Sequence, residues 1–232
     1  MTQKKFSTLE ECCEFVRQLR WLTPAQILEQ KDDIVTMHIA LTKHIDEIIN
    51  RVCARHGLRC QWELSYRLKS SWGRCGLVKI TLNPEALFGG ANFFMTLILH
   101  ELAHLTNFNH GTNFWRTHIA YLQEEGLLPQ GKILESQVIK QSNTVSYKNK
   151  WYLGLWSEIK PSIQLTLNGE PIVDLYSHNK IKDLYGTYFH LHNPSLRAKL
   201  SVDGLQQLQT VKIMRAIIRK AIKQQLNINI MA

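Results

Sequence analysis

The feature that most constrains this chain is a nearly continuous apolar run over residues 92–106, which leads into the letters HELAHLTNFNH. The run predicts a buried helix. On such a helix His100 and His104 lie four positions apart on one face, and Glu101 lies a short arc away. Burying these polar side chains without partners would cost on the order of a few kcal/mol. The fold must therefore provide interior partners for them.

The spacing of these residues is typical of a catalytic zinc site, in which three protein ligands leave one position open for water. A His-Glu-x-x-His helix supplies two ligands and a base. His110 follows after five intervening residues, so the chain can turn and bring a third imidazole back, and Asn107 and Asn109 suit that turn. The alternative is that the motif is accidental and that His104 is an ordinary buried histidine.

The segments before this motif predict further helices. Residues 8–20 begin with Thr8 and Glu11 at the spacing of a capping box, and Thr23-Pro24 begins a second, short helix. Apolar residues recur at helical spacing over residues 35–55, and His56-Gly57 ends that run. We therefore expect a helical lead-in followed by one long amphipathic helix.

Two strands are expected between the long helix and the motif. CQWELSYRL and LVKITLN alternate in polarity, and SSWGRCG is predicted to be the loop that joins them. Residues 112–123 predict another helix after the motif, which Gly126 ends. The order is helix, strand, strand, helix, helix, which indicates an α+β fold.

Four short motifs carry a resemblance to known proteins: SSWGRC, ITLNP, TLILHELAHL and HGTNFW. Together they resemble the SprT-like zinc metallopeptidases and the related YgjP-type family over about residues 35–125. The GRC element and the His-Gly pair are similar to SprT-like proteins, whereas the five-residue gap before His110 is closer to the YgjP type. The resemblance implies a compact gluzincin-like core and protease activity, in some SprT-like members on proteins bound or crosslinked to DNA.

The resemblance also implies roles for individual residues. His100, His104 and His110 would bind Zn²⁺, and Glu101 would act as general base. Metzincins share the spacing from His104 to His110, but they have glycine where this chain has Asn107, and no methionine turn is apparent. The resemblance therefore implies a zinc metallopeptidase that acts on a protein or peptide substrate.

Two residues of the SSWGRC segment are candidates for the border of the cleft. Trp72 and Arg74 could flank the substrate, with Arg74 polarising the scissile carbonyl. An arginine that only braces the loop between two strands would fit the same position. Trp72 and Arg74 are therefore possible cleft residues, and the sequence does not assign either of them a single role.

The last third of the chain has a different composition. Residues 1–147 hold 16 Lys and Arg against 14 Asp and Glu, whereas residues 148–232 hold 12 against 5, within a net charge of +9 for all 232 residues. Asn168-Gly169 predicts a hairpin turn in a small sheet. We expect a lead-in over 1–34, a metallopeptidase domain over 35–145, and a small β-rich module over 146–232 that ends in a basic helix.

The basic helix is predicted over residues 205–225. Leu208, Val211, Met214 and Ile218 share one stripe, and five cations lie largely off it. These cations are Lys212, Arg215, Arg219, Lys220 and Lys223. They could contact the phosphates of DNA, or they could form only a solvated face. The alternative function is accordingly a nucleic-acid-binding protein with a structural or catalytically idle zinc site.

The cysteines and the start of the chain indicate a compartment. Five cysteines without a C-x-x-C pair argue against a disulfide framework and against a zinc ribbon. The first residues contain no apolar core followed by a cleavage site, and no apolar run is long enough to span a membrane. We expect a cytoplasmic protein without a membrane partner, whose oligomeric state the sequence does not define.

Overall fold

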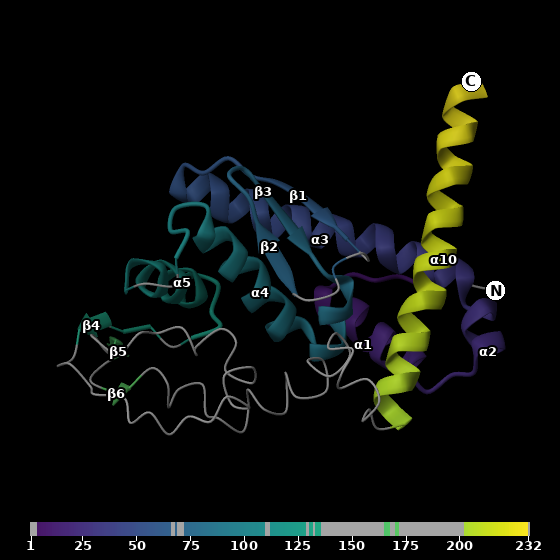
Figure 1. The fold of residues 1–232 in the computed structure, drawn as a ribbon, viewed down its shortest axis with the longest axis horizontal. Helices are drawn as coiled ribbons and strands as arrows, with labels where there is room; N and C mark the ends of the chain where they lie inside the picture. Colours follow the sequence, from purple (N-terminus) through teal and green to yellow (C-terminus); the bar gives the residue numbers. More distant parts are fainter. Residues whose placement is uncertain are drawn as a thin grey trace.

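The fold was analysed in a computed structural model that describes about two thirds of the chain (Figure 1). The described residues are 4–65, 68, 72–109, 112–128, 130–131, 133–135, 165–167, 170–171 and 202–231. In chain order the elements are α1 (Leu9–Leu19), α2 (Pro24–Glu29), α3 (Lys31–His56), β1 (Gln61–Leu64), β2 (Gly73–Cys75), β3 (Lys79–Leu82), η1 (Pro84–Gly89), α4 (Ala91–His104), α5 (Thr112–Glu124), β4 (Ile133–Glu135), β5 (Leu165–Leu167), β6 (Glu170–Pro171) and α10 (Val202–Met231). This mixture of helices and small sheets is an α+β fold.

Local sequence signals account for the ends of the first three helices. Thr8 and Glu11 form the predicted capping box of α1, and Thr23 forms another at the start of α2. Gly57 ends α3 in the left-handed conformation with φ of 64°, which favours glycine because a Cβ atom is disfavoured there. The two predicted N-terminal helices and the long amphipathic helix are thus confirmed.

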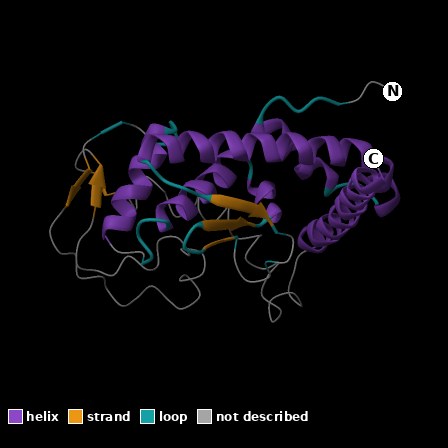
Figure 2. Cartoon of the chain, turned by 90° about the horizontal axis from the view of Figure 1, so that it is seen from above, coloured by secondary structure: helices purple, strands orange, loops and turns teal. Residues whose placement is uncertain are grey.

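The first sheet has three strands in the order β1-β3-β2, with β1 parallel and β2 antiparallel to the central β3. Ile80 and Leu82 of β3 are buried, whereas Lys79 and Thr81 on the other face bond to Glu63 of β1. Figure 2 shows α3 running alongside these strands. One face of the sheet is therefore apolar and packed, and the other is polar.

The prediction that SSWGRCG is a loop was wrong for its last part. Residues 73–75 form the edge strand β2, which pairs with β3. A strand of three residues is too short to show the alternation of polar and apolar side chains by which strands are recognised. Its conformation comes from pairing with β3, which local sequence does not reveal.

The chain then passes into the motif helix. The side chain of Asn83 accepts a hydrogen bond from the backbone N–H of Glu85 at the start of η1. Helix α4 follows after Gly90 and is buried along most of its length. It packs against η1, β2, β3 and α5, so the motif lies at the centre of the fold.

Helix α5 is attached to the end of α3 by ion pairs. Arg51 of α3 contacts Glu125 at 2.5 Å, and Arg55 contacts Glu124 at 2.9 Å. The His56 ring lies 2.8 Å from the same Glu124 carboxylate. These contacts fix the C-terminal end of α5, which lies beside α4.

The last helix packs against the first part of the chain. Helix α10 contacts α2 and α3, and its Val211, Met214 and Ile218 are buried in the core. The predicted apolar stripe is thus confirmed at these three positions, while the side chain of Leu208 lies outside the described residues. Figure 1 shows α10 at the opposite end of the molecule from α5.

A second small sheet has the order β4-β5-β6, all antiparallel. Strands β5 and β6 flank Asn168-Gly169, as expected of a hairpin, although those two residues lie outside the described part. The strands expected in WYLGLW and TYFHLH also lie outside it. No helix in the described part of the chain combines the length and apolar character that crossing a bilayer requires.

Candidate metal centre

The two motif histidines of α4 bring their ring nitrogens together. The Nε2 atoms of His100 and His104 lie 3.2 Å apart, with the rings at 82° to each other. Two imidazole nitrogens at the usual 2.0–2.1 Å from a tetrahedral zinc ion are separated by about 3.3 Å. The pair therefore fits two corners of a tetrahedral site.

A backbone contact defines which nitrogen of His104 is available. Its Nδ1 lies 3.0 Å from the carbonyl oxygen of Asn107, which can only accept a hydrogen bond. The Nδ1 atom therefore carries the proton and donates it, which leaves a lone pair on Nε2. Metal-binding histidines commonly have this second contact, because it fixes the tautomer and the ring orientation.

Glu101 lies buried beneath the edge strand β2. A Cβ atom added to Gly73 would lie only 2.7 Å from Cγ and from Cδ of Glu101, so the strand and the carboxylate can approach this closely only because residue 73 is glycine. Sequence reasoning did not single out Gly73 itself. The signal that could have identified it is the glycine within SSWGRC.

The burial of Glu101 changes its acidity. Desolvation raises the pKa of this carboxyl to about 8, because the charged form loses its hydration in the interior. A divalent cation close to the group would act in the opposite direction by favouring the carboxylate. The protonation state of the buried Glu101 carboxyl therefore depends strongly on whether a cation is close to it.

Helix α5 packs aromatic rings against both histidines. The Phe114 ring centroid lies 4.8 Å from that of His100 and 4.4 Å from that of His104. His118, which is fully buried, meets His100 edge to face at 5.4 Å. These contacts restrict the rotamers of the pair, and the role of His118 beside His100 was not anticipated from the sequence.

The remaining predicted site residues lie in different surroundings. His110 lies outside the described residues. Trp72 packs edge to face against Phe93 of α4 at 6.0 Å. Arg74 is exposed and, since side chains alternate along a strand, points to the opposite face of the sheet from Gly73. That Trp72 and Arg74 border a cleft stays a prediction.

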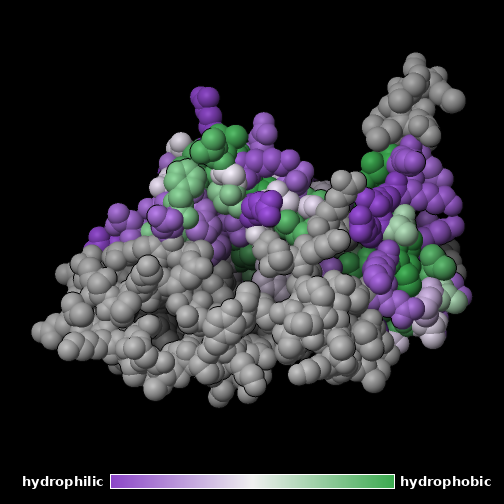
Figure 3. All heavy atoms as spheres, in the orientation of Figure 1, coloured by the Kyte–Doolittle hydropathy of each residue, from purple (hydrophilic) through white to green (hydrophobic). Residues whose placement is uncertain are grey.

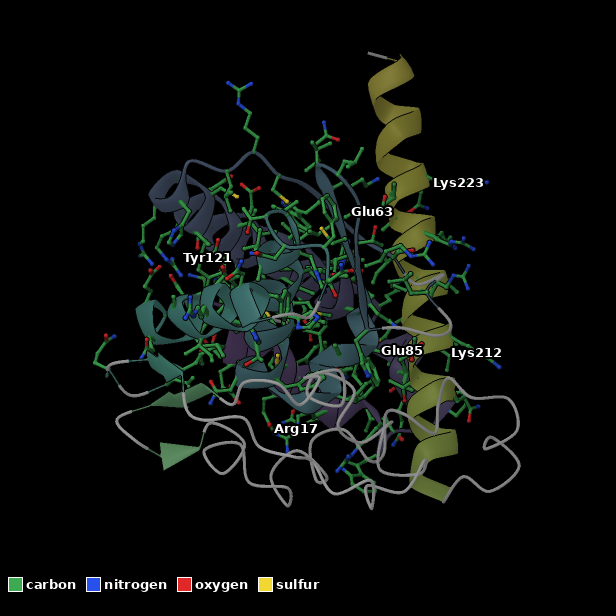
Figure 4. The ribbon with its side chains drawn as sticks, turned by 60° about the vertical axis from the view of Figure 1, so that its left-hand side comes forward. Arg17, Glu63, Glu85, Tyr121, Lys212 and Lys223 are labelled. Atoms are coloured by element: carbon green, nitrogen blue, oxygen red, sulfur yellow. The ribbon has the colours of Figure 1, made fainter. Side chains whose placement is uncertain are left out.

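The basic residues lie far from the histidine pair along the molecule. Lys212, Arg219, Lys220 and Lys223 of α10 are exposed, and Arg215 is partly buried. Figure 4 shows Lys212 and Lys223 pointing away from the body of the protein. These cations therefore form a surface separate from the motif helix.

Within the described part of the chain, no group of three or more His, Cys, Asp and Glu side chains is arranged to hold a metal ion. The described ligand geometry thus consists of the pair His100 and His104. The distance within this pair, the tautomer of His104 and the adjacent carboxylate are compatible with the binding of a divalent metal ion.

Comparison with known proteins identifies the class to which this centre belongs. The model of the YgjP-like metallopeptidase domain matches residues 7–124, which include α1 to α5 and the whole motif. The chain belongs to the YgjP-like metallopeptidase family. A search of curated proteins and a search of solved structures each gave no match.

Proposed function

We propose that this protein is a zinc-dependent endopeptidase in which His100, His104 and His110 hold the metal ion and Glu101 is the general base. The observation that carries the proposal is the 3.2 Å separation of the two Nε2 atoms beside a buried carboxylate. Membership of a metallopeptidase family supports the reaction class. The spacing of His110 in the sequence supports its role as third ligand.

The chain's own residues would move the proton during hydrolysis. A bound zinc ion would supply Lewis acidity, lowering the pKa of water toward about 7 and polarising the peptide carbonyl. Glu101 would accept the proton of the attacking water and then donate it to the nitrogen of the leaving amine. The burial of Glu101 under β2 favours this transfer because few other water molecules can compete for the carboxylate.

Among the described residues β2 is an edge strand whose outer side pairs with no other strand, and such an edge suits an extended peptide. The Trp72 carbonyl accepts a hydrogen bond from the Asn83 N–H at 2.7 Å, and hydrogen bonding to the neighbouring strand alternates along an antiparallel ladder. Gly73 and Cys75 therefore direct their backbone groups away from β3. A substrate that pairs with this edge would pass next to Glu101, which lies against Gly73.

The test of this proposal is Glu101→Gln compared with wild type. The amide can neither accept the water proton nor deliver it, so peptide cleavage should disappear while zinc content and thermal unfolding stay unchanged. Glu63→Gln, which changes an exposed carboxylate on β1, should cleave like wild type. Equal cleavage by wild type and Glu101→Gln would refute the assignment of the base.

A second candidate function is nucleic-acid binding by α10, with the zinc site structural or idle. The observation that favours it is that none of the five cations of α10 forms an ion pair with another described residue. Such a surface could contact phosphates without first breaking an ion pair among the described residues. Binding to DNA by protein that cleaves no peptide would favour this function over the first.

A further inference from the structure

Two exposed apolar segments flank the histidine pair. Leu77 and Val78, in the turn between β2 and β3, are 80% and 57% exposed, and Phe108, in the loop after α4, is 64% exposed. Single exposed apolar residues are ordinary, whereas a group of them beside a site indicates binding. Figure 3 shows hydrophobic surface gathered over the part of the molecule where Figure 1 draws this turn and this loop.

Both segments are tied to the site by short covalent paths. Gly73 of β2 lies against the Glu101 side chain, and the strand leads through Cys75 into the turn, so that Leu77 follows four residues after Gly73. Phe108 directly follows Asn107, whose carbonyl accepts the His104 hydrogen bond. The turn borders the site on the side of Glu101 and β2, and the loop borders it on the side of His104.

The chemistry of the two segments favours uncharged ligands. Residues 75–78 and 105–109 contain no charged side chain, although the protein as a whole has a net charge of +9. An apolar side chain that covers these residues removes apolar surface from water on both partners, which is favourable in proportion to the area buried. A charged side chain in the same place would lose hydration without gaining an ion pair from residues 75–78 or 105–109.

We propose that Leu77, Val78 and Phe108, here named the apolar rim, bind an extended, apolar segment of a polypeptide, so that the substrate class is unfolded protein. Apolar segments of this kind are interior in a folded protein and become accessible when it unfolds. The rim continues from the outer edge of β2, which pairs with no other described strand and can supply backbone hydrogen bonds to an extended chain. This inference rests on the proposed function, because it concerns the substrate of the same site.

The test measures peptide binding to the Glu101→Gln protein, which leaves the probe uncut. One fluorescent peptide carries several Leu and Phe residues, and its matched partner carries Gln and Asn in their place. We expect the apolar peptide to bind at least about tenfold more tightly, in line with the burial of one or two large side chains. Equal affinity for the two peptides, or no binding of either, would overturn the inference.

The rim itself is tested by Leu77→Ser combined with Phe108→Ser. This variant should lose about tenfold in affinity for the apolar peptide and keep its affinity for the polar peptide. The matched control is Leu28→Ser combined with Ile39→Ser, since these residues are 54% and 56% exposed on α2 and α3. An equal loss in the control, or a dimer that the rim variant dissociates, would show that the rim does not bind substrate.

Cleavage of both peptides by wild type separates this inference from the proposed function. Cleavage without preference for the apolar peptide would overturn the inference and leave the peptidase assignment intact. Preferential binding without any cleavage would support the rim and refute the peptidase assignment.

Discussion

Helices α4 and α10 both bury an apolar face, but they hold their polar side chains in opposite environments. In α4, His100 and Glu101 are buried within the core. In α10, Val211 and Ile218 are buried, while most of the cations face solvent. A buried polar group costs free energy unless it has a partner, whereas an exposed cation costs almost nothing.

This difference decides how much each helix reveals about function. The polar residues of α4 require an explanation, and a metal centre supplies one. The cations of α10 are compatible with a binding surface and with simple solvation. A substitution in or beside the polar face of α4 should accordingly change peptide cleavage or zinc content strongly. A substitution on the polar face of α10 should change them little.

The largest effect is expected from Gly73→Ala. The new methyl group would overlap the Glu101 side chain and displace its carboxylate, so kcat/KM should fall by at least about a hundredfold. Gly76→Ala is the matched control, because a Cβ atom there would meet the nearest atom, the Lys79 carbonyl, at an ordinary 3.5 Å. Comparable activity of the two variants in a peptide cleavage assay would contradict the close approach of β2 to Glu101.

The next effect concerns metal content. His104→Ala should reduce bound zinc from about one ion per chain to a small fraction, because two remaining ligands hold the ion weakly. The measurement is elemental analysis after dialysis against a weak chelator, with His44→Ala, a histidine of α3, as control. Full zinc occupancy in the His104 variant would remove this residue from the ligand set.

A moderate effect is expected on the apolar face of α10. Ile218 is buried against the N-terminal helices, so Ile218→Ala should lower the free energy of unfolding by about 2 to 4 kcal/mol. Substitution of the exposed Lys220 by Gln should change it by less than about 0.5 kcal/mol. Denaturant titrations of both variants measure the contrast, and equal stabilities would show that α10 does not belong to the core.

The smallest effect is expected on the polar face of α10. Replacing Arg215, Arg219 and Lys223 by Gln should leave peptide cleavage unchanged. If α10 binds duplex DNA, the slope of log affinity against log salt should flatten by roughly two to three, because each phosphate contact contributes about 0.9. An unchanged affinity and slope would leave these cations as a solvated face.

Local signals predicted the helices and half of the candidate site. The capping boxes of α1 and α2, the end of α3 at Gly57 and the facing histidines of α4 all follow from residues within a few positions of one another. Such patterns depend on backbone geometry over one or two helical turns, so the spacing of residues in the sequence is enough to predict them.

The rest depends on contacts between distant segments. Gly73 and Glu101 are 28 positions apart, and their approach exists only because β2 pairs with β3 above α4. The packing of α10 against α2 and α3 likewise joins the two ends of the chain. The residue pattern within one segment does not reveal such long-range contacts. For this reason SSWGRCG was predicted to be a loop, and the helices that pack against α10 were not predicted.

The most direct test of the account is X-ray absorption at the zinc edge of the metal-loaded protein. The account predicts nitrogen and oxygen ligands at about 2.0–2.1 Å, with the multiple-scattering signal of three imidazoles and with no sulfur at about 2.3 Å. In His104→Ala the imidazole signal should decrease together with the bound metal. A spectrum dominated by sulfur ligands, or a wild-type protein that retains no zinc, would contradict the assignment of a histidine-held metal centre.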